Sequence, residues 1–386
     1  MRERVIALVD CDSFFVSCEV KDKPELQDKP VCVLTSSGMK GIVVSRSKAA
    51  KALGIKMGAP YFQIKDVYKD VIFISSRMHR YSVISEQVMS CLKQFSPEIE
   101  VTSIDEAFID LTGLDKLWKK SYTNIISEIK AKIWEEIHIP VSIGLSSSKI
   151  LAKLASDKAK TGSGVFIIEK NKIKELVGDV DIEEVSGIGN KNAQKLKFYG
   201  IYTINDFVCQ DNMWIKKVLG FNGLILKQEL LGTTTSYVNA KQVPPQSIQD
   251  TKSFEYFTSD LEFLKGALNN HIHCACQKLR KYNGYTSSVE VILKTKDFKL
   301  ISNGVNFSIA TNSDFEIRKY AYKLLNSIYR PNILYRSVGI VLKNLSYGEI
   351  MQSSLFGNLQ RKDDKLSRVI DNLEDKFGVG IVKTLK

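Results

Sequence analysis

Acidic residues at the ends of two predicted strands constrain the fold and chemistry of this chain more than any other feature. The apolar run 5–9 ends at Asp10, and the strand-like run 107–111 begins directly after Asp105 and Glu106. Short apolar runs of this length are typical of buried strands. Carboxylates beside an apolar core are costly unless a cation neutralises them. The pattern therefore predicts a site for divalent cations, which prefer oxygen ligands and as a pair can hold both the attacking and the leaving oxygen of a phosphoryl transfer.

An isolated Asp-Glu pair is usually an exposed strand end, but here the acids belong to three ordered motifs. The motifs are residues 10–15 followed by Glu19, residues 103–108, and residues 144–149 running on to Lys160. In this order and at these separations they resemble the Y-family translesion DNA polymerases. The resemblance extends over nearly the whole chain.

The resemblance implies an α+β fold, a multidomain right-hand polymerase with palm, fingers, a helical thumb and a ferredoxin-like little finger. A length of 386 residues agrees with several units, because one ordinary core rarely serves so long a chain. The β-α-β-β-α-β order of predicted elements after residue 249 also indicates a ferredoxin-like sandwich. The expected parts are the palm at 1–12 and 76–169, the fingers at 13–75, the thumb at 170–235, a linker at 236–248, the little finger at 249–348 and a tail at 349–386.

The same resemblance assigns roles to the acids. Asp10, Asp105, Glu106 and the main-chain carbonyl of Cys11 would bind two Mg²⁺ ions, and Asp105 and Glu106 would be the catalytic acids. A second group of metal-binding residue types, residues 271–276, lies within one helical pattern. Successive side chains on a helix diverge, so we expect no zinc site there.

The expected nucleotide site draws on aromatic and basic residues. Phe14 and Phe15 would lie at the incoming deoxynucleoside triphosphate, with Phe15 as the steric gate whose ring leaves no room for a 2′-hydroxyl. Lys51 and Lys160 would bind the triphosphate. Many family members have an arginine where this chain has Lys51 and an aromatic residue where it has Lys48. Lysine at 51 keeps the charge but lacks the planar guanidinium fork.

The expected macromolecular partner is primer–template DNA. The formal charge of +12 favours a polyanion, because each lysine or arginine that neutralises a phosphate releases a counterion. Gly187, Gly189 and Lys191 lie in a segment that resembles a helix-hairpin-helix, whose glycines let backbone amides approach a DNA phosphate.

A short motif in the tail indicates a protein partner. Gln352, Leu355 and Phe356 resemble the peptide with which bacterial polymerases bind their sliding clamp, and an amphipathic helix is expected to follow at 364–377. The family resemblance adds SOS accessory proteins to the expected partners. The sequence contains no apolar run of about 18 or more residues, so we expect no membrane partner and a cytoplasmic location.

The expected function is template-directed DNA synthesis of the translesion type, with low fidelity and no proofreading. Two alternatives remain open. A nucleotide cyclase can also use paired acids on a palm-like sheet, although it needs neither the hairpin nor the clamp-like peptide. A catalytically silent DNA- or clamp-binding relative would not need to keep Asp10, Asp105 and Glu106. Mg²⁺-dependent primer extension would separate the three.

Overall fold

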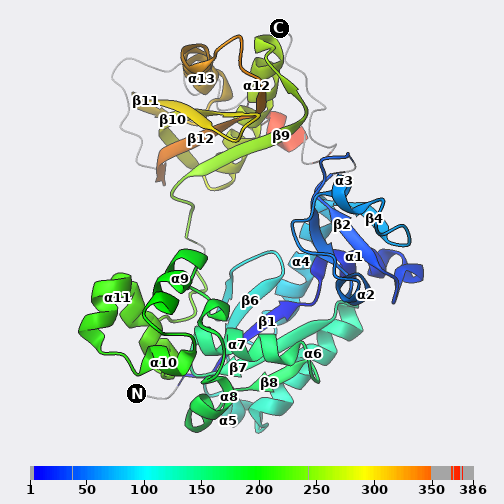
Figure 1. The fold of residues 1–386 in the computed structure, drawn as a ribbon, viewed down its shortest axis with the longest axis vertical. Helices are drawn as coiled ribbons and strands as arrows, with labels where there is room; N and C mark the ends of the chain where they lie inside the picture. The colour runs from blue at the N-terminus through cyan, green and yellow to red at the C-terminus, as the bar shows by residue number, and fades with distance from the viewer. Residues whose placement is uncertain are drawn as a thin grey trace. The chain divides into compact units, whose positions relative to one another are not determined.

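The chain is described by a computed structural model that covers residues 4–36, 38–241, 243–348, 367, 369–373 and 376. It divides into two compact units, residues 1–242 and 243–386, each with cores of its own (Figure 1). None of the described helices is long and apolar enough to cross a membrane.

A five-stranded sheet lies at the centre of the first unit. Its strands are β1 (Ile6–Cys11), β5 (Ile99–Val101), β6 (Glu106–Asp110), β7 (Val141–Ser146) and β8 (Val165–Ile167). The order is β5-β6-β1-β7-β8, with β1 antiparallel to both neighbours and β8 parallel to β7. Alternate residues of β1 face opposite sides of the sheet, because Ala7 and Val9 pack into one core whereas Ile6 and Leu8 pack into another.

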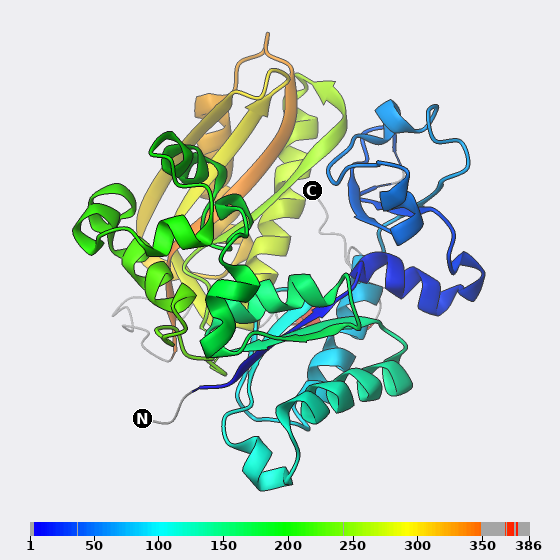
Figure 2. The same ribbon diagram turned by 60° about the horizontal axis from the view of Figure 1, so that its bottom comes forward.

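Helices cover both faces of this sheet (Figure 2). They are α4 (Met78–Leu92), α5 (Leu114–Trp118), α6 (Tyr122–Ile137) and α7 (Lys149–Ala159). Side chains of α4 and α6 share the core with Val9, whereas Ala152 of α7 packs with Leu8 on the other face. Gly144 lets α7 approach β7 closely, because a Cβ there would come 2.0 Å from the backbone nitrogen of Ser156.

A smaller mixed sheet forms a separate layer of the first unit. Its strands are β2 (Val31–Leu34), β3 (Val43–Arg46) and β4 (Ile72–Ser75), in the order β3-β2-β4 with β2 parallel to β4. The runs 30–34 and 41–45 of the sequence predict the first two of these strands, whereas β4 was not predicted. Short helices accompany it: α1 (Phe14–Asp22), the 3₁₀ helix η1 (Pro24–Leu26), α2 (Lys48–Ala52) and α3 (Tyr61–Ile64).

The first unit also contains a helical region with its own core. Its elements are η2 (Lys170–Lys172), α8 (Ile173–Val177), η3 (Ile182–Glu184), α9 (Asn190–Phe198), α10 (Ile204–Val208) and α11 (Asn212–Leu230). A capping box starts α10, since the Thr203 hydroxyl accepts from the Asp206 amide and the Asp206 carboxylate accepts from the Thr203 amide.

The first residues of the expected linker are anchored to the first unit. Glu229 of α11 is 2% exposed, and its Oε1 accepts hydrogen bonds from the amides of Thr235 at 2.7 Å and Ser236 at 2.8 Å. Val238 is buried beside Ile6 of β1. Residues 235–238, which we call the strap, are therefore fixed to the first unit, although the sequence predicted a linker from residue 236.

The second unit has the expected β-α-β-β-α-β order. It consists of β9 (Ile248–Thr258), α12 (Leu261–Lys281), β10 (Gly284–Thr295), β11 (Leu300–Thr311), α13 (Asp314–Ile328) and β12 (Tyr335–Tyr347). The antiparallel sheet has the order β11-β10-β12-β9, and both helices contribute to one core with it. The α+β class predicted from the sequence is confirmed.

A buried arginine joins the described part of the C-terminal helix to this unit. Arg280 of α12 has a side chain only 4% exposed. It donates to Asp314 at 2.6 Å and, through Nε and Nη2, to both carboxylate oxygens of Asp371 at 2.6 and 2.8 Å. The described residues of the helix predicted at 364–377, namely 367, 369–373 and 376, are helical.

Candidate active site

The three predicted acids lie together on or directly before neighbouring strands of the five-stranded sheet, with Asp105 immediately before β6. Asp10 in β1 pairs in register with Glu106 in β6. The carbonyl of Asp105 accepts a hydrogen bond from the amide of Cys11 at 2.8 Å. The antiparallel pairing of β1 and β6 thus brings two acidic segments from distant parts of the chain to one place.

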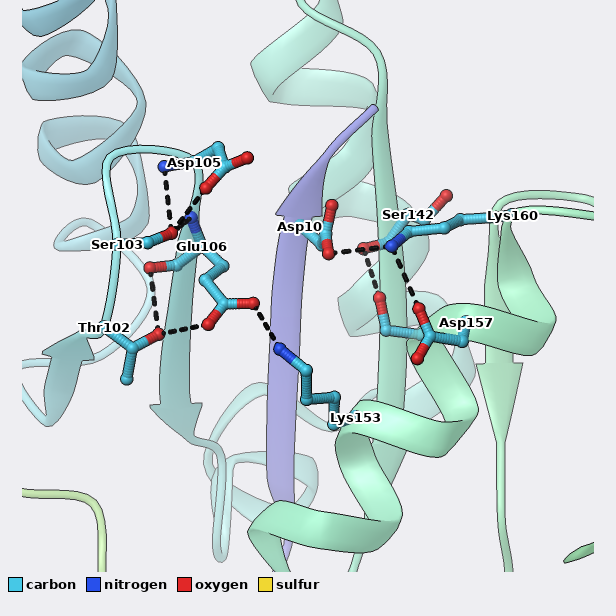
Figure 3. A network of polar contacts seen from close by, with 10 residues as sticks. Asp10, Thr102, Ser103, Asp105, Glu106, Ser142, Lys153, Asp157 and Lys160 are labelled. Carbon is cyan, nitrogen blue, oxygen red and sulfur yellow. Dashed lines mark hydrogen bonds and ion pairs between the residues drawn. The ribbon is translucent and has the colours of Figure 1, made fainter. Parts of the chain in front are cut away.

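Lysines on or next to α7 contact two of these acids (Figure 3). Lys160 donates from Nζ to Asp10 Oδ2 at 2.9 Å, and Lys153 donates from Nζ to Glu106 Oε2 at 2.7 Å. Burial raises the pKa of Asp10; the hydrogen bond from Lys160 offsets this in part, and repulsion from Asp105 and Glu106 adds to it. The site therefore holds crowded negative charge that cations stabilise.

Glu106 keeps its negative charge more easily than Asp10. Burial alone would raise its pKa, but hydrogen bonds from Lys153 and Thr102 outweigh burial, so the pKa of Glu106 is lowered. Thr102 Oγ1 donates to Glu106 Oε1 at 2.9 Å. Both carboxylate oxygens of Glu106 are consequently held by neighbours.

The donor atoms of the site suit hard divalent cations, because all three acids offer carboxylate oxygens. Among the residues that the structure describes, however, no group of three or more His, Cys, Asp or Glu side chains is arranged to hold a metal ion. Glu106 is turned toward Lys153 and Thr102, and Asp105 accepts a hydrogen bond from the Ser103 hydroxyl. Joint metal binding by the three acids therefore involves side-chain positions that differ from those in this structure.

A pocket of about 360 Å³ opens beside the acids. It collects these predicted site residues: Asp10, Cys11, Phe14, Phe15, Lys51, Asp105 and Lys160. It is also lined by Arg46 and Lys48, and by residues to which the sequence assigned no specific role: Asp12, Ser13, Val44, Ser45 and Met57. Asp12 and Ser13 lie within the motif 10–15, and Val44, Ser45 and Met57 lie near Lys48 and Lys51 in the sequence.

The turn between β1 and α1 presents the two phenylalanines. Ser13, the N-cap of α1, has the left-handed conformation with φ 47° and ψ 44°, which is uncommon for a residue other than glycine. Ser45 of β3 supports the turn by donating from its hydroxyl to the Ser13 carbonyl at 3.2 Å. Phe14 is 3% exposed and contributes to the core, whereas Phe15 is only half-buried at the pocket wall.

Basic side chains of the β3–α2 segment also line the pocket. Lys48 and Lys51 lie three residues apart on α2, so they share one side of the helix. Arg46 donates to the carbonyl of Ile55. Together with Lys160 these residues set cations beside the carboxylates, an arrangement that suits a phosphate chain chelated to metal.

The other predicted site residues lie outside this pocket. Gly187 has φ +96°, which favours glycine, and Gly189 is the N-cap of α9. Lys191 is exposed in the first turn of that helix. The clamp-like residues Gln352, Leu355 and Phe356 lie outside the described residues.

Two family models match the chain. The model described as "impB/mucB/samB family" matches residues 9–157, and the model described as "impB/mucB/samB family C-terminal domain" matches residues 245–355. Protein UmuC of Salmonella typhimurium is 32% identical, with 97% of this chain and 92% of the relative covered. DNA polymerase IV 1 of Bacillus subtilis is 28% identical, with 99% of this chain and 92% of the relative covered.

Solved structures show the same architecture. A "Y-family DNA polymerase chimera Dbh-Dpo4(243-245)-Dbh" matches with a TM-score of 0.77 and 26% identity over 89% of this chain and 100% of that chain. An "Insertion ternary complex of Dbh DNA polymerase" matches with a TM-score of 0.59 and 26% identity over the same shares. The multidomain polymerase fold expected from the sequence is confirmed. The acidic motifs, the fold and these matches together show that the chain belongs to the impB/mucB/samB family, the Y-family translesion DNA polymerases.

Proposed function

We propose that this chain copies primer–template DNA by adding deoxynucleotides to the primer 3′ end, with low fidelity and without proofreading. The pocket that joins Asp10 and Asp105 to Phe15 and Lys160 carries the proposal. It offers carboxylates for metal-assisted phosphoryl transfer, a ring for the sugar and a cation for the phosphates. The similar structures of Dbh DNA polymerase, an insertion ternary complex and a post-insertion binary complex, support the assignment of DNA and nucleotide as substrates.

The proposed cofactor is a pair of Mg²⁺ ions held by Asp10, Asp105, Glu106 and the carbonyl of Cys11. Such ions would lower the pKa of the primer hydroxyl and stabilise the leaving pyrophosphate. Crowding and burial, which raise the pKa of Asp10, favour cations at this place. With metal ions held by the acids, Lys160 would be free to leave Asp10 and bind the triphosphate together with Lys51.

We also assign the parts of the chain to the domains of a right-hand polymerase, several of which would bind the DNA. We assign the five-stranded sheet to the palm, the β3-β2-β4 sheet to the fingers, the helical region after residue 170 to the thumb and the second unit to the little finger. Backbone amides near Gly187 and Gly189, with Lys191, would bind a DNA phosphate without reading sequence. We expect the protein to act in the cytoplasm.

Primer extension with and without Mg²⁺ tests the catalytic proposal. Asp105→Ala and Glu106→Ala should each abolish extension while DNA affinity stays within about twofold, because most of that affinity comes from phosphate contacts elsewhere. Glu98→Ala, at an exposed acid near the same sheet, is the matched control and should extend normally. Extension by either site variant would refute the assignment of these acids.

The same assay separates the alternative functions. Cyclic nucleotide made without primer would identify a cyclase, and DNA binding without extension by the parent would identify a silent relative.

The tail is proposed to bind the bacterial sliding clamp through Gln352, Leu355 and Phe356, with SOS accessory proteins as further partners. Burial of an apolar anchor contributes about 1.5–3 kcal/mol, so a double Leu355→Ala, Phe356→Ala variant should lose measurable clamp binding. Clamp-independent extension should persist. Unchanged affinity in a clamp titration would show that this segment is not the binding peptide.

A further inference from the structure

Phe15 stacks on a second aromatic side chain that is not part of the pocket lining. The ring centroids of Phe15 and Tyr81 lie 4.7 Å apart with an interplanar angle of 16°. Tyr81, on α4, is 0% exposed, so no ligand can reach its ring. Tyr81 therefore supports Phe15 from within the core.

The hydroxyl of Tyr81 is itself anchored. It donates to Glu19 Oε1 at 2.7 Å, and Glu19 is 0% exposed. Arg77 donates from Nε to Oε1 and from Nη2 to Oε2 of the same carboxylate, both at 2.8 Å. Burial and the hydrogen bond to Glu19 raise the pKa of Tyr81, which keeps the hydroxyl protonated as a donor. A charged, bidentate pair thus fixes the far end of the stacked ring.

The same contacts join two helices. Phe15, Glu19 and Asp22 recur at helical spacing on α1, so they share one face. Arg77 bridges Glu19 and Asp22, since its Nη2 also donates to Asp22 Oδ2 at 2.8 Å. Arg80 adds a bond from Nη2 to Asp22 Oδ1 at 2.7 Å. The helix that carries Phe15 is therefore held against α4 along the whole row.

We infer that Tyr81 is a positioning residue for sugar selection, which holds the Phe15 ring against the sugar of the bound nucleotide. The inference rests on the proposed role of Phe15 as steric gate. A ring excludes a 2′-hydroxyl only if it cannot tilt away. Stacking on Tyr81, whose hydroxyl is bound to Glu19, removes the space into which Phe15 would retreat.

The test is the ratio of kcat/KM for a deoxynucleotide to that for the matching ribonucleotide in primer extension. Tyr81→Leu should lower this ratio by about two- to tenfold, the range that the loss of one aromatic pair corresponds to. Tyr81→Phe keeps the ring and should lower it less. Val88→Ala, another truncation in the same core and on the same helix, is the matched control and should leave the ratio unchanged.

A double variant shows whether Tyr81 acts through Phe15. In a Phe15→Ala background, Tyr81→Leu should change the ratio no further, because the ring that it supports is gone. An additive effect, or an unchanged ratio in Tyr81→Leu while Phe15→Ala lowers it, would overturn the inference and leave the gate intact. An unchanged ratio in Phe15→Ala would instead overturn the proposed gate. If Tyr81→Leu does not fold, a ratio for Tyr81→Phe equal to that of Val88→Ala would overturn the inference.

Discussion

Lys153 compensates the charge of Glu106 before any substrate is present. Its ammonium helps hold the pKa of Glu106 below the ordinary value, so Lys153→Met should raise that pKa. Loss of kcat/KM on acidification should then begin at a higher pH than in the parent, because this profile reports ionisations of the free enzyme. Lys158→Met, on the same helix, is the control. Superimposable pH profiles for parent and Lys153→Met would show that the pair is dispensable.

At the scale of elements, one carboxylate secures the strap that follows α11. Glu229 Oε1 accepts from the Thr235 and Ser236 amides, and Oε2 accepts from the Lys149 amide at 3.1 Å. A glutamine offers one acceptor oxygen and an NH₂ group that faces a donor, so Glu229→Gln should lower the free energy of unfolding of the first unit by about 1–3 kcal/mol. Hydrogen exchange at residues 235 and 236 should accelerate. Glu175→Gln, an exposed acid, should change neither, and unaltered exchange in Glu229→Gln would contradict the anchor.

At the scale of the whole molecule, two units with separate cores should unfold in separable steps. Arg280→Met removes the guanidinium from the partly buried Asp371 and Asp314, although Asp314 keeps His273 as a further partner, so we expect the second unit to lose about 2–4 kcal/mol. The melting temperature of the second unit should fall while that of the first stays constant. Exposed Lys323→Met is the control on α13. Equal shifts of both transitions would show that the units are coupled.

The second unit should also be sensitive to acid. Burial alone would raise the pKa of Asp314, but hydrogen bonds and attraction from His273 and Arg280 outweigh it, so the pKa is lowered. A lowered carboxyl pKa contributes stability that is complete above the unfolded value of about 3.9 and is lost as the pH falls through the folded value. Denaturation monitored from pH 6 to pH 3 should therefore show stability lost below about pH 4. In Arg280→Met the second unit should lose less stability between pH 6 and pH 3 than the parent does. Identical stability profiles for the two proteins would show that Asp314 is not the source of the acid sensitivity.

Much of the fold was predictable because it depends on local patterns. The apolar runs around Asp10 and Glu106 predicted two strands, and the element order after residue 249 predicted the sandwich of the second unit. Strand β4 and the strap at 235–236 were missed. Strand β4 depends on β2, a parallel neighbour from an earlier part of the chain. The strap depends on Glu229, which is near in sequence but whose carboxylate is buried by packing that the local sequence does not show.

By itself the sequence determined the family and the candidate residues for the chemistry, because motif order and residue type are local properties of the chain. Only the tertiary structure decided which neighbours those side chains have. Lys160 meets Asp10 across 150 residues, and the hydroxyl of Tyr81 meets Glu19 across 62. Such contacts arise when sheet register and helix packing close long loops, and no local pattern encodes the distance between two atoms on different elements.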